Sequence, residues 1–170
     1  VVLLLGAGAS IDANIPHTAK MISLINNLLA EDDEWKLYKP IYQHLKQLYG
    51  SASWDKETGS VSHGDLNIEE LVSILDELLS LFDGRHSLYH FFKNWIDMFG
   101  NLYGFKDLKN FRDKIENKLK EWVVPPQYDL SYYRHLLLFA KENPGTGLRV
   151  FTLNYDRCIE ESFIEFSQTD

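Results

Sequence analysis

The stretch Val1-Val2-Leu3-Leu4-Leu5-Gly6-Ala7-Gly8-Ala9-Ser10 decides the predicted fold. Its five unbroken apolar residues are typical of a central parallel strand that helices cover on both faces. Gly6 and Gly8 let the backbone turn tightly and approach a ligand without a Cβ in between. A helix that begins near Ser10 or Ile11 would direct its free N–H groups at a phosphate beside the turn. The stretch therefore predicts a nucleotide or dinucleotide site.

The glycine pattern alone also fits a tight turn that binds no ligand. Ile11 occupies the position at which the dinucleotide-binding fingerprint has its third glycine. No Gly-Lys-Ser or Gly-Lys-Thr follows either, so the turn is not a P-loop. Both interpretations stay open until the rest of the chain is considered.

The composition is that of a globular chain and restricts its partners. Of the 170 residues 45% are hydrophobic, and ten Phe, nine Tyr and four Trp supply large core side chains. A net charge of −8 disfavours nucleic acid and anionic membrane surfaces as partners. The single cysteine, Cys158, cannot build a disulfide framework or a Cys-rich zinc site, which suggests a cytoplasmic location and no metal.

Hydrophobic periodicity predicts helices over most of the remaining chain. One of them is expected to kink or break at Pro40, and another to start at a cap on Asn67 or Asp65 and to end at Gly84. Residues 50–64 have no periodicity and are expected to form a mobile loop. The expected helices are Thr18–Ala30, Glu34–Tyr49, Asn67–Phe82, Ser87–Phe99, Asp107–Val123, Leu130–Glu142 and Asp156–Phe166.

A second strand is expected at Leu148–Leu153, after a turn at Asn143–Gly147. The fold class is therefore predicted to be α/β, with a Rossmann-like parallel sheet and a large helical insertion between its first strand and this one. Two strands are too few for a stable sheet. The chain also opens inside a strand, so we expect residues 1–170 to be an incomplete excerpt of a longer protein.

Polar side chains follow the second strand, in the run Thr152-Leu153-Asn154-Tyr155-Asp156. Ligands of open parallel sheets bind outside the carboxyl ends of the strands, so this run and the glycine turn are expected to face one crevice. Asn154 offers an amide and Asp156 a carboxylate. A purely structural role is the alternative, in which Asn154 turns the chain and Asp156 caps the following helix.

Taken together, the Gly6–Ser10 turn, Ile15-Pro16 and the run Thr152–Asp156 resemble the sirtuin-like NAD-binding family, and in particular its prokaryotic branch in anti-phage defence proteins. The resemblance is specific over residues 1–30 and 148–162. It implies that residues 1–170 are part of one sirtuin-like domain. Residues 1–30 and 146–170 would form its Rossmann-like core, and 31–145 a mostly helical insertion with the mobile loop near 50–64.

The resemblance also implies roles for the matching residues. Gly6, Ala7, Gly8, Ala9 and Ser10 would line the pyrophosphate of NAD through their N–H groups. Ile15 and Pro16 would lie over the nicotinamide-side pocket, and Thr152 would also belong to the NAD-binding residues. The catalytic residues would be Asn154 and Asp156. Asn154 would hold the nicotinamide ribose and the attacking water, and Asp156 would hold the carboxamide or brace the loop. The implied reaction cleaves the bond between nicotinamide and ribose.

The departures from the family pattern favour hydrolysis of NAD over protein deacylation. His17-Thr18-Ala19 stands where deacylases have Asp-Phe-Arg, and one cysteine cannot supply their two Cys-x-x-Cys zinc pairs. The family's catalytic His is expected beyond Asp170. We therefore expect an NAD glycohydrolase that depletes NAD in defence and is gated by self-association or by a partner domain. A sensor that binds NAD or ADP-ribose without cleaving it, and a deacylase, are the alternatives.

Overall fold

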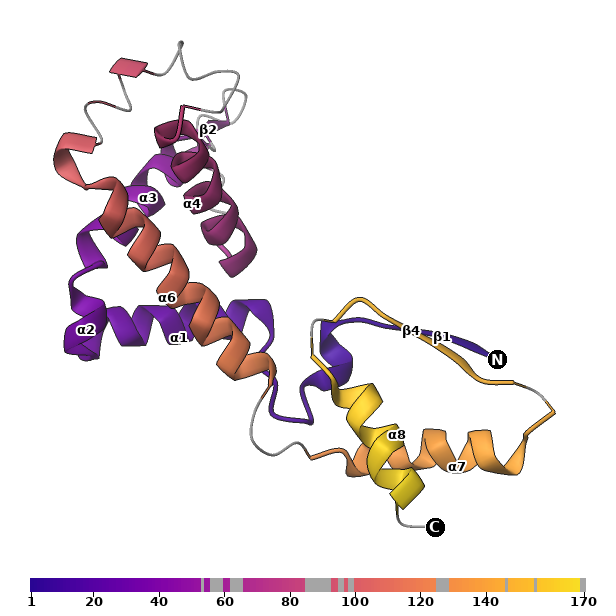
Figure 1. The fold of residues 1–170 in the computed structure, drawn as a ribbon. Helices are drawn as coiled ribbons and strands as arrows, with labels where there is room; N and C mark the ends of the chain where they lie inside the picture. The colour runs from indigo at the N-terminus through magenta and orange to yellow at the C-terminus, as the bar shows by residue number, and fades with distance from the viewer. Residues whose placement is uncertain are drawn as a thin grey trace. The chain divides into compact units, whose positions relative to one another are not determined.

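The computed structural model describes residues 1–52, 54–55, 60–61, 66–84, 93–94, 97, 100–124, 129–145, 147–154 and 156–168. These residues form two compact units (Figure 1). The first consists of Val1–His17 and Lys118–Asp170, and the second of Thr18–Asn117. The predicted helix Ser87–Phe99 lies mostly outside the described residues, as does Asp65, the alternative cap of the helix Asn67–Phe82.

The predicted Rossmann-like sheet with a helical insertion is wrong. The described residues are mostly helical, and the only parallel sheet among them has two strands, β1 (Val2–Leu5) and β4 (Arg149–Thr152). The reason lies in the sequence pattern: helical periodicity dominates from Thr18 onward, and only two segments carry the short apolar pattern of a parallel strand.

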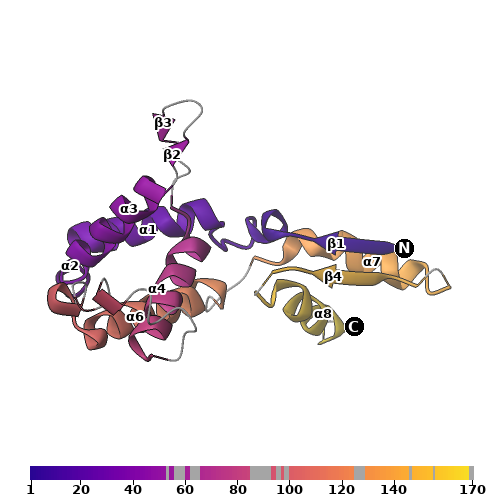
Figure 2. The same ribbon diagram turned by 90° about the horizontal axis from the view of Figure 1, so that it is seen from above.

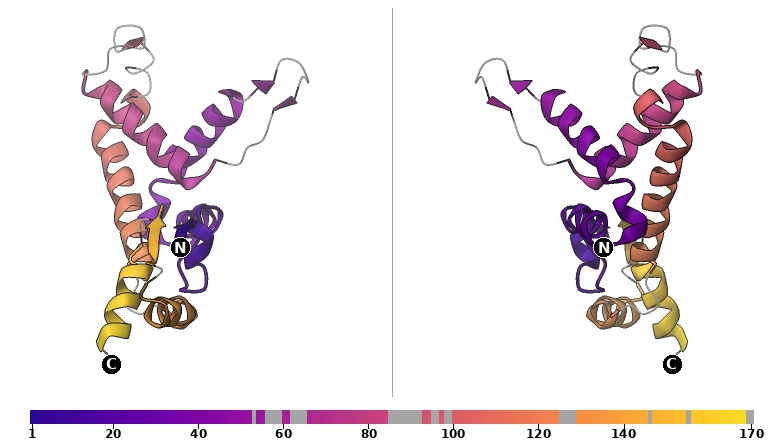
Figure 3. Two further views of the ribbon diagram at one scale, coloured as in Figure 1. Left: turned by 90° about the vertical axis from the view of Figure 1, so that its right-hand side faces the viewer. Right: turned by 90° about the vertical axis from the view of Figure 1, so that its left-hand side faces the viewer.

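In the first unit β1 and β4 pair in parallel, with Val2 opposite Arg149 and Leu5 opposite Thr152. The helices α7 (Arg134–Glu142) and α8 (Cys158–Gln168) lie on one face of this sheet (Figures 1 and 3). The expected burial of β1 on both faces is wrong: Val2 is 66% exposed and Leu4 68%, whereas Leu3 and Leu5 are half-buried. The alternation arises because successive strand residues point to opposite faces, and helices cover only one of them.

The core of the first unit lies beside the glycine turn. Its buried members are Ala13, Ile15, Tyr133 and Cys158, and Leu5 at the end of β1 packs against them. Two short 3-10 helices frame this core, η1 (Ala7–Ser10) after β1 and η2 (Ser131–Tyr133) before α7. The end of β1 is thus fixed to the start of α8 through shared packing.

The second unit is helical and holds the larger apolar core. Its helices are α1 (Thr18–Glu31), α2 (Asp33–Lys36), α3 (Lys39–Ala52), α4 (Ile68–Phe82) and α6 (Phe105–Val123), the last of which ends in the first unit. Figure 2 shows these helices from a second direction. Phe111 of α6 is fully buried and stacks on Tyr38, with ring centroids 5.1 Å apart.

Several local predictions for the second unit are confirmed. The expected break near Pro40 separates α2 from α3, and Pro40 lies in the first turn of α3, where its missing N–H costs no bond. Asn67 caps α4 in a capping box with Glu70. Gly84 follows α4 with φ of +68°, a conformation that side chains other than glycine rarely adopt.

The expected loop at residues 50–64 is only partly described. α3 continues to Ala52, and β2 (Trp54–Asp55) pairs antiparallel with β3 (Ser60–Val61). Residues 53, 56–59 and 62–64 lie outside the described part. In the described helices there is no segment with the length and apolar character needed to cross a bilayer.

Candidate functional site

The glycine turn and the end of β4 meet through the side chain of Asn154. Its Nδ2 donates hydrogen bonds to the Gly6 carbonyl at 3.0 Å and to the Ser10 Oγ at 2.9 Å. Its backbone N–H donates to Thr152 Oγ1 at 3.0 Å. Both amide hydrogens are therefore used, and the remaining acceptor, Oδ1, receives no hydrogen bond from the described residues.

The turn itself differs from the predicted strand-to-helix junction. No α-helix begins near Ser10 or Ile11: residues 7–10 form the 3-10 helix η1, and α1 begins at Thr18. Asn14 adopts a left-handed φ of 66° between them. Asn tolerates this conformation better than most residues, and it lets Ile15 N–H return to the Ser10 carbonyl at 3.2 Å. The turn is thus held together by backbone hydrogen bonds between residues that are close in the sequence.

The carbonyl oxygens of this turn are occupied by donors from the protein. The Gly6 carbonyl accepts from Ala9 N–H at 2.9 Å and from Asn154, and the Ser10 carbonyl accepts from Ala13 and Ile15 N–H. The Ala9 carbonyl accepts from the hydroxyl groups of Tyr132 and Tyr133. The carbonyl oxygens of Gly6, Ala9 and Ser10 are thus already satisfied by donors from the protein.

Ala7 and Gly8 open η1, and the first N–H groups of a 3-10 helix find no acceptor within it. The Gly8 N–H donates to no other residue in the part of the chain that the structure describes. The start of the turn therefore offers a backbone donor that an anionic ligand could use.

The two glycines of the turn have open space in front of them. A Cβ built on Gly6 or Gly8 meets no atom within 4 Å, and neither residue has a positive φ. Gly6 has φ of −112° and ψ of −177°, an extended conformation that any residue adopts. Neither backbone conformation nor packing inside the described part of the chain requires glycine here, and the space before both residues is open to a close approach from outside.

Asp156 caps the start of α8. Its Oδ1 accepts a hydrogen bond from Cys158 N–H at 3.0 Å, which is the capping geometry expected of an Asp in front of a helix. The Cys158 thiol beneath it is 1% exposed, and burial raises its pKa to about 12. The thiol stays protonated and unreactive at neutral pH, as a buried cysteine is expected to.

The remaining candidate residues divide between core and surface. Ile15 is buried in the core beside Tyr133 and Cys158, so its side chain supports the turn from below. Pro16 is half-buried, and Thr152 holds the backbone of Asn154. Ser10 is 1% exposed, and its hydroxyl belongs to the same bonded group. The part of the chain that the structure describes contains no cluster of three His, Cys, Asp or Glu residues able to hold a metal ion.

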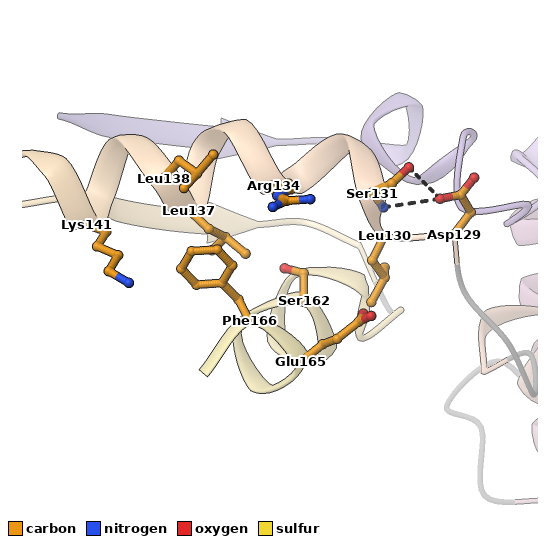
Figure 4. Close-up of a pocket in the computed structure, with 10 residues that line it drawn as sticks. All are labelled: Asp129, Leu130, Ser131, Arg134, Leu137, Leu138, Lys141, Ser162, Glu165 and Phe166. Carbon is orange, nitrogen blue, oxygen red and sulfur yellow. Dashed lines mark hydrogen bonds between the residues drawn. The ribbon is translucent and has the colours of Figure 1, made fainter. Parts of the chain in front are cut away.

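A separate cavity of about 490 Å³ opens between α7 and α8 (Figure 4). Arg134 and Lys141 of α7 lie on its wall with Phe166 of α8, and Lys141 Nζ lies 5.8 Å from the centre of the Phe166 ring. At one end Asp129 Oδ1 accepts from the Ser131 hydroxyl at 2.7 Å. None of the residues of the glycine turn lines this cavity, so it is distinct from the candidate site.

Sequence reasoning missed Tyr132 and Tyr133. They were expected only as members of a helix at Leu130–Glu142, and nothing in their spacing indicates contact with Ala9, more than 120 positions away. Comparison of the chain with protein-family models, with curated proteins and with solved structures found no match.

Proposed function

We propose that the chain binds NAD at the Gly6–Ser10 turn and hydrolyses it to nicotinamide and ADP-ribose. The observation that carries the proposal is the double hydrogen bond of Asn154 to Gly6 and Ser10, which joins an anion-favouring turn to a polar strand end. The pyrophosphate would accept hydrogen bonds from the N–H groups of Ala7 and Gly8. The open space before Gly6 and Gly8 lets it approach the backbone.

The same arrangement suits cleavage of the bond between nicotinamide and ribose. That bond breaks with its electron pair going to the nicotinamide nitrogen, so the leaving group departs neutral and needs no strong acid. Water then bonds to the ribose carbon and loses a proton to solvent. Asn154 Oδ1, free among the described residues and fixed by the bonds of its own Nδ2, would accept a hydrogen bond from this water or from a ribose hydroxyl.

The resemblance to defence proteins adds the biological context. Uncontrolled loss of NAD is toxic, so the activity would be held in check by self-association or by a partner domain and released during phage infection. Both the defence role and the gating belong to this proposal, since they rest on the resemblance and not on contacts within the chain.

The experiment measures release of nicotinamide from NAD by the chain and by two variants. Asn154→Ala should lower the rate by about a hundredfold, because the water loses its fixed acceptor and the turn loses its bridge. Asn26→Ala is the control, since Asn26 Nδ2 donates to the Ile22 carbonyl at 3.0 Å in the helical unit and lies outside the site. In the full-length protein under activating conditions, intact NAD in all three, or equal rates for both variants, would contradict hydrolysis at this site.

A sensor that binds NAD or ADP-ribose without cleaving it is the second candidate. One observation favours the sensor: both polar residues of the strand end already make hydrogen bonds within the protein. Asn154 donates to the turn, and Asp156 accepts from the N–H of Cys158. A sensor predicts that ADP-ribose raises the melting temperature while NAD stays intact. Nicotinamide release above the level of Asn154→Ala would exclude it.

A further inference from the structure

The cavity between α7 and α8 has the size of a small-molecule site. Its volume of about 490 Å³ falls within the range of about 300–1,000 Å³ that ligand pockets occupy. Both helices contribute residues three or four positions apart, so each presents one stripe to the cavity (Figure 4). The α7 stripe is Arg134, Leu137, Leu138 and Lys141, and α8 contributes Ser162 and Phe166. Most of the wall is therefore carried by helices, which hold side chains in place better than loops do.

The Arg134 guanidinium has no acid that neutralises it. It makes no hydrogen bond or ion pair with any residue that the structure describes. Asp129 lies at one end of the cavity, but its Oδ1 accepts from the N–H of Ser131 at 3.2 Å and from the Ser131 hydroxyl at 2.7 Å. The guanidinium therefore keeps its N–H donors for a group that enters the cavity.

Apolar side chains lie beside this cation. Leu137 is buried, and Leu138 and Phe166 are half-buried on the cavity wall. Lys141 Nζ lies 5.8 Å from the centre of the Phe166 ring, a contact that favours this placement of the ring. The cavity thus combines one unpaired cation with an apolar surface that an aromatic or aliphatic group can cover.

The other charges on the wall distinguish between classes of anion. Arg134 and Lys141 are cations, but Asp129 and Glu165 place two carboxylates on the same wall. A phosphate carries about two negative charges near neutral pH and would be repelled by both of them. A carboxylate carries a single charge, and its planar shape lets it accept parallel hydrogen bonds from a guanidinium. The wall therefore favours a monocarboxylate.

We propose that the cavity between α7 and α8 binds a small organic monocarboxylate with an apolar or aromatic body. Arg134 donates hydrogen bonds to the carboxylate, and the body packs against Leu137, Leu138 and Phe166. The site shares no lining residue with the glycine turn and does not depend on the hydrolysis of NAD.

The test titrates phenylacetate into the full-length protein and follows the methyl resonances of Leu137 and Leu138. Phenylacetate joins a carboxylate to an aromatic ring, and it should shift these resonances with a dissociation constant in about the millimolar range, as a ligand of this size does. Phenylacetamide has the same shape without the charge and should bind about tenfold more weakly. This comparison uses the unaltered chain, so it does not depend on the folding of a variant.

A variant then tests the role of Arg134. Arg134→Gln should weaken the binding of phenylacetate about tenfold, since it removes the charged donor. Arg149→Gln is the matched control, because Arg149 is an exposed residue of β4 in the same unit and does not line the cavity.

Three results would overturn the inference. The first is that phenylacetate leaves the two methyl resonances unchanged. The second is that phenylacetamide, or folded Arg134→Gln, gives the same affinity as phenylacetate with the unaltered chain. The third is that the resonances shift on dilution of the protein alone, because a second copy of the chain would then fill the cavity. None of these results bears on NAD hydrolysis at Asn154, so the two proposals fail separately.

Discussion

Replacing Gly8 by Ala separates the stability of the glycine turn from its use as a ligand site. Gly8 has no positive φ, and a Cβ there meets no atom within 4 Å. The substitution should therefore leave the free energy of unfolding unchanged or raise it by about 0.4–1 kcal/mol, because alanine restricts the unfolded chain. If the turn has only a structural role, the substitution should have no effect beyond this change in the free energy of unfolding.

A ligand that approaches the turn changes this expectation. The added methyl group would occupy the space in which a phosphate oxygen contacts the backbone, at a cost of about 1–3 kcal/mol for overpacking. That range is about 5- to 150-fold in the dissociation constant of NAD. Gly50→Ala in α3 is the matched control, since its Cβ also meets no atom and it lies in the helical unit.

The assay pairs thermal or chemical unfolding with calorimetric titration of NAD on the same preparations. We expect Gly8→Ala to fold at least as well as the unaltered chain and to bind NAD more weakly, and Gly50→Ala to bind it normally. Unchanged affinity in folded Gly8→Ala would refute the reasoning, because the space before the turn would then not be where the ligand lies.

Three further predictions concern the helical unit. Phe111→Ala should lower the free energy of unfolding by about 3–5 kcal/mol, measured by denaturant titration, since it empties a fully buried aromatic site. Asn67→Ala should cost about 1 kcal/mol in the same assay by removing the cap of α4, whereas Asn26→Ala should cost less. Hydrogen bonds from Asn67 N–H and the Tyr49 hydroxyl hold the pKa of Glu70 below its usual value, so its contribution to stability is complete above the unfolded-state pKa and is lost as the pH falls through the folded one. Glu70→Gln should therefore flatten the acid side of the stability curve, and an unchanged curve would count against this pair of bonds.

Helices with a full set of local signals were predictable from the sequence. The stripe of α4 repeats every three or four residues, Asn67 and Glu70 form its capping box, and Gly84 follows its end. Each of these signals acts within a few residues, so no distant contact is needed to interpret it. Pro40 likewise predicts that α2 and α3 are separate helices, because its ring is not tolerated in the interior of a helix.

The sheet was not predictable in the same way. An apolar run such as Val1–Leu5 indicates a strand but does not state how many neighbours pair with it or which face a helix covers. The exposure of Val2 and Leu4 depends on the placement of α7 and α8 on one face, and their sequences do not encode that choice locally.

The candidate site could be predicted in part from the sequence. That the turn and the strand end come together followed from the rule that parallel strands place their carboxyl ends at one edge. The bonds from Tyr132 and Tyr133 could not be inferred, because they connect residues far apart in the chain without any motif.

The pairing of β1 with β4 also bears on the order in which the parts of the protein fold. Gly6 and Asn154 are 148 positions apart, and closing a flexible loop of that length costs about 4 kcal/mol of chain entropy. The contacts of the helical unit join residues of one continuous segment and form without that closure. We therefore expect the segment between the strands to become compact before they meet, which would lower the entropy cost of joining them. We expect assembly of the glycine turn with Asn154 to be a late folding event, and amide exchange at Leu153, whose N–H donates to the Leu5 carbonyl, would report when it happens.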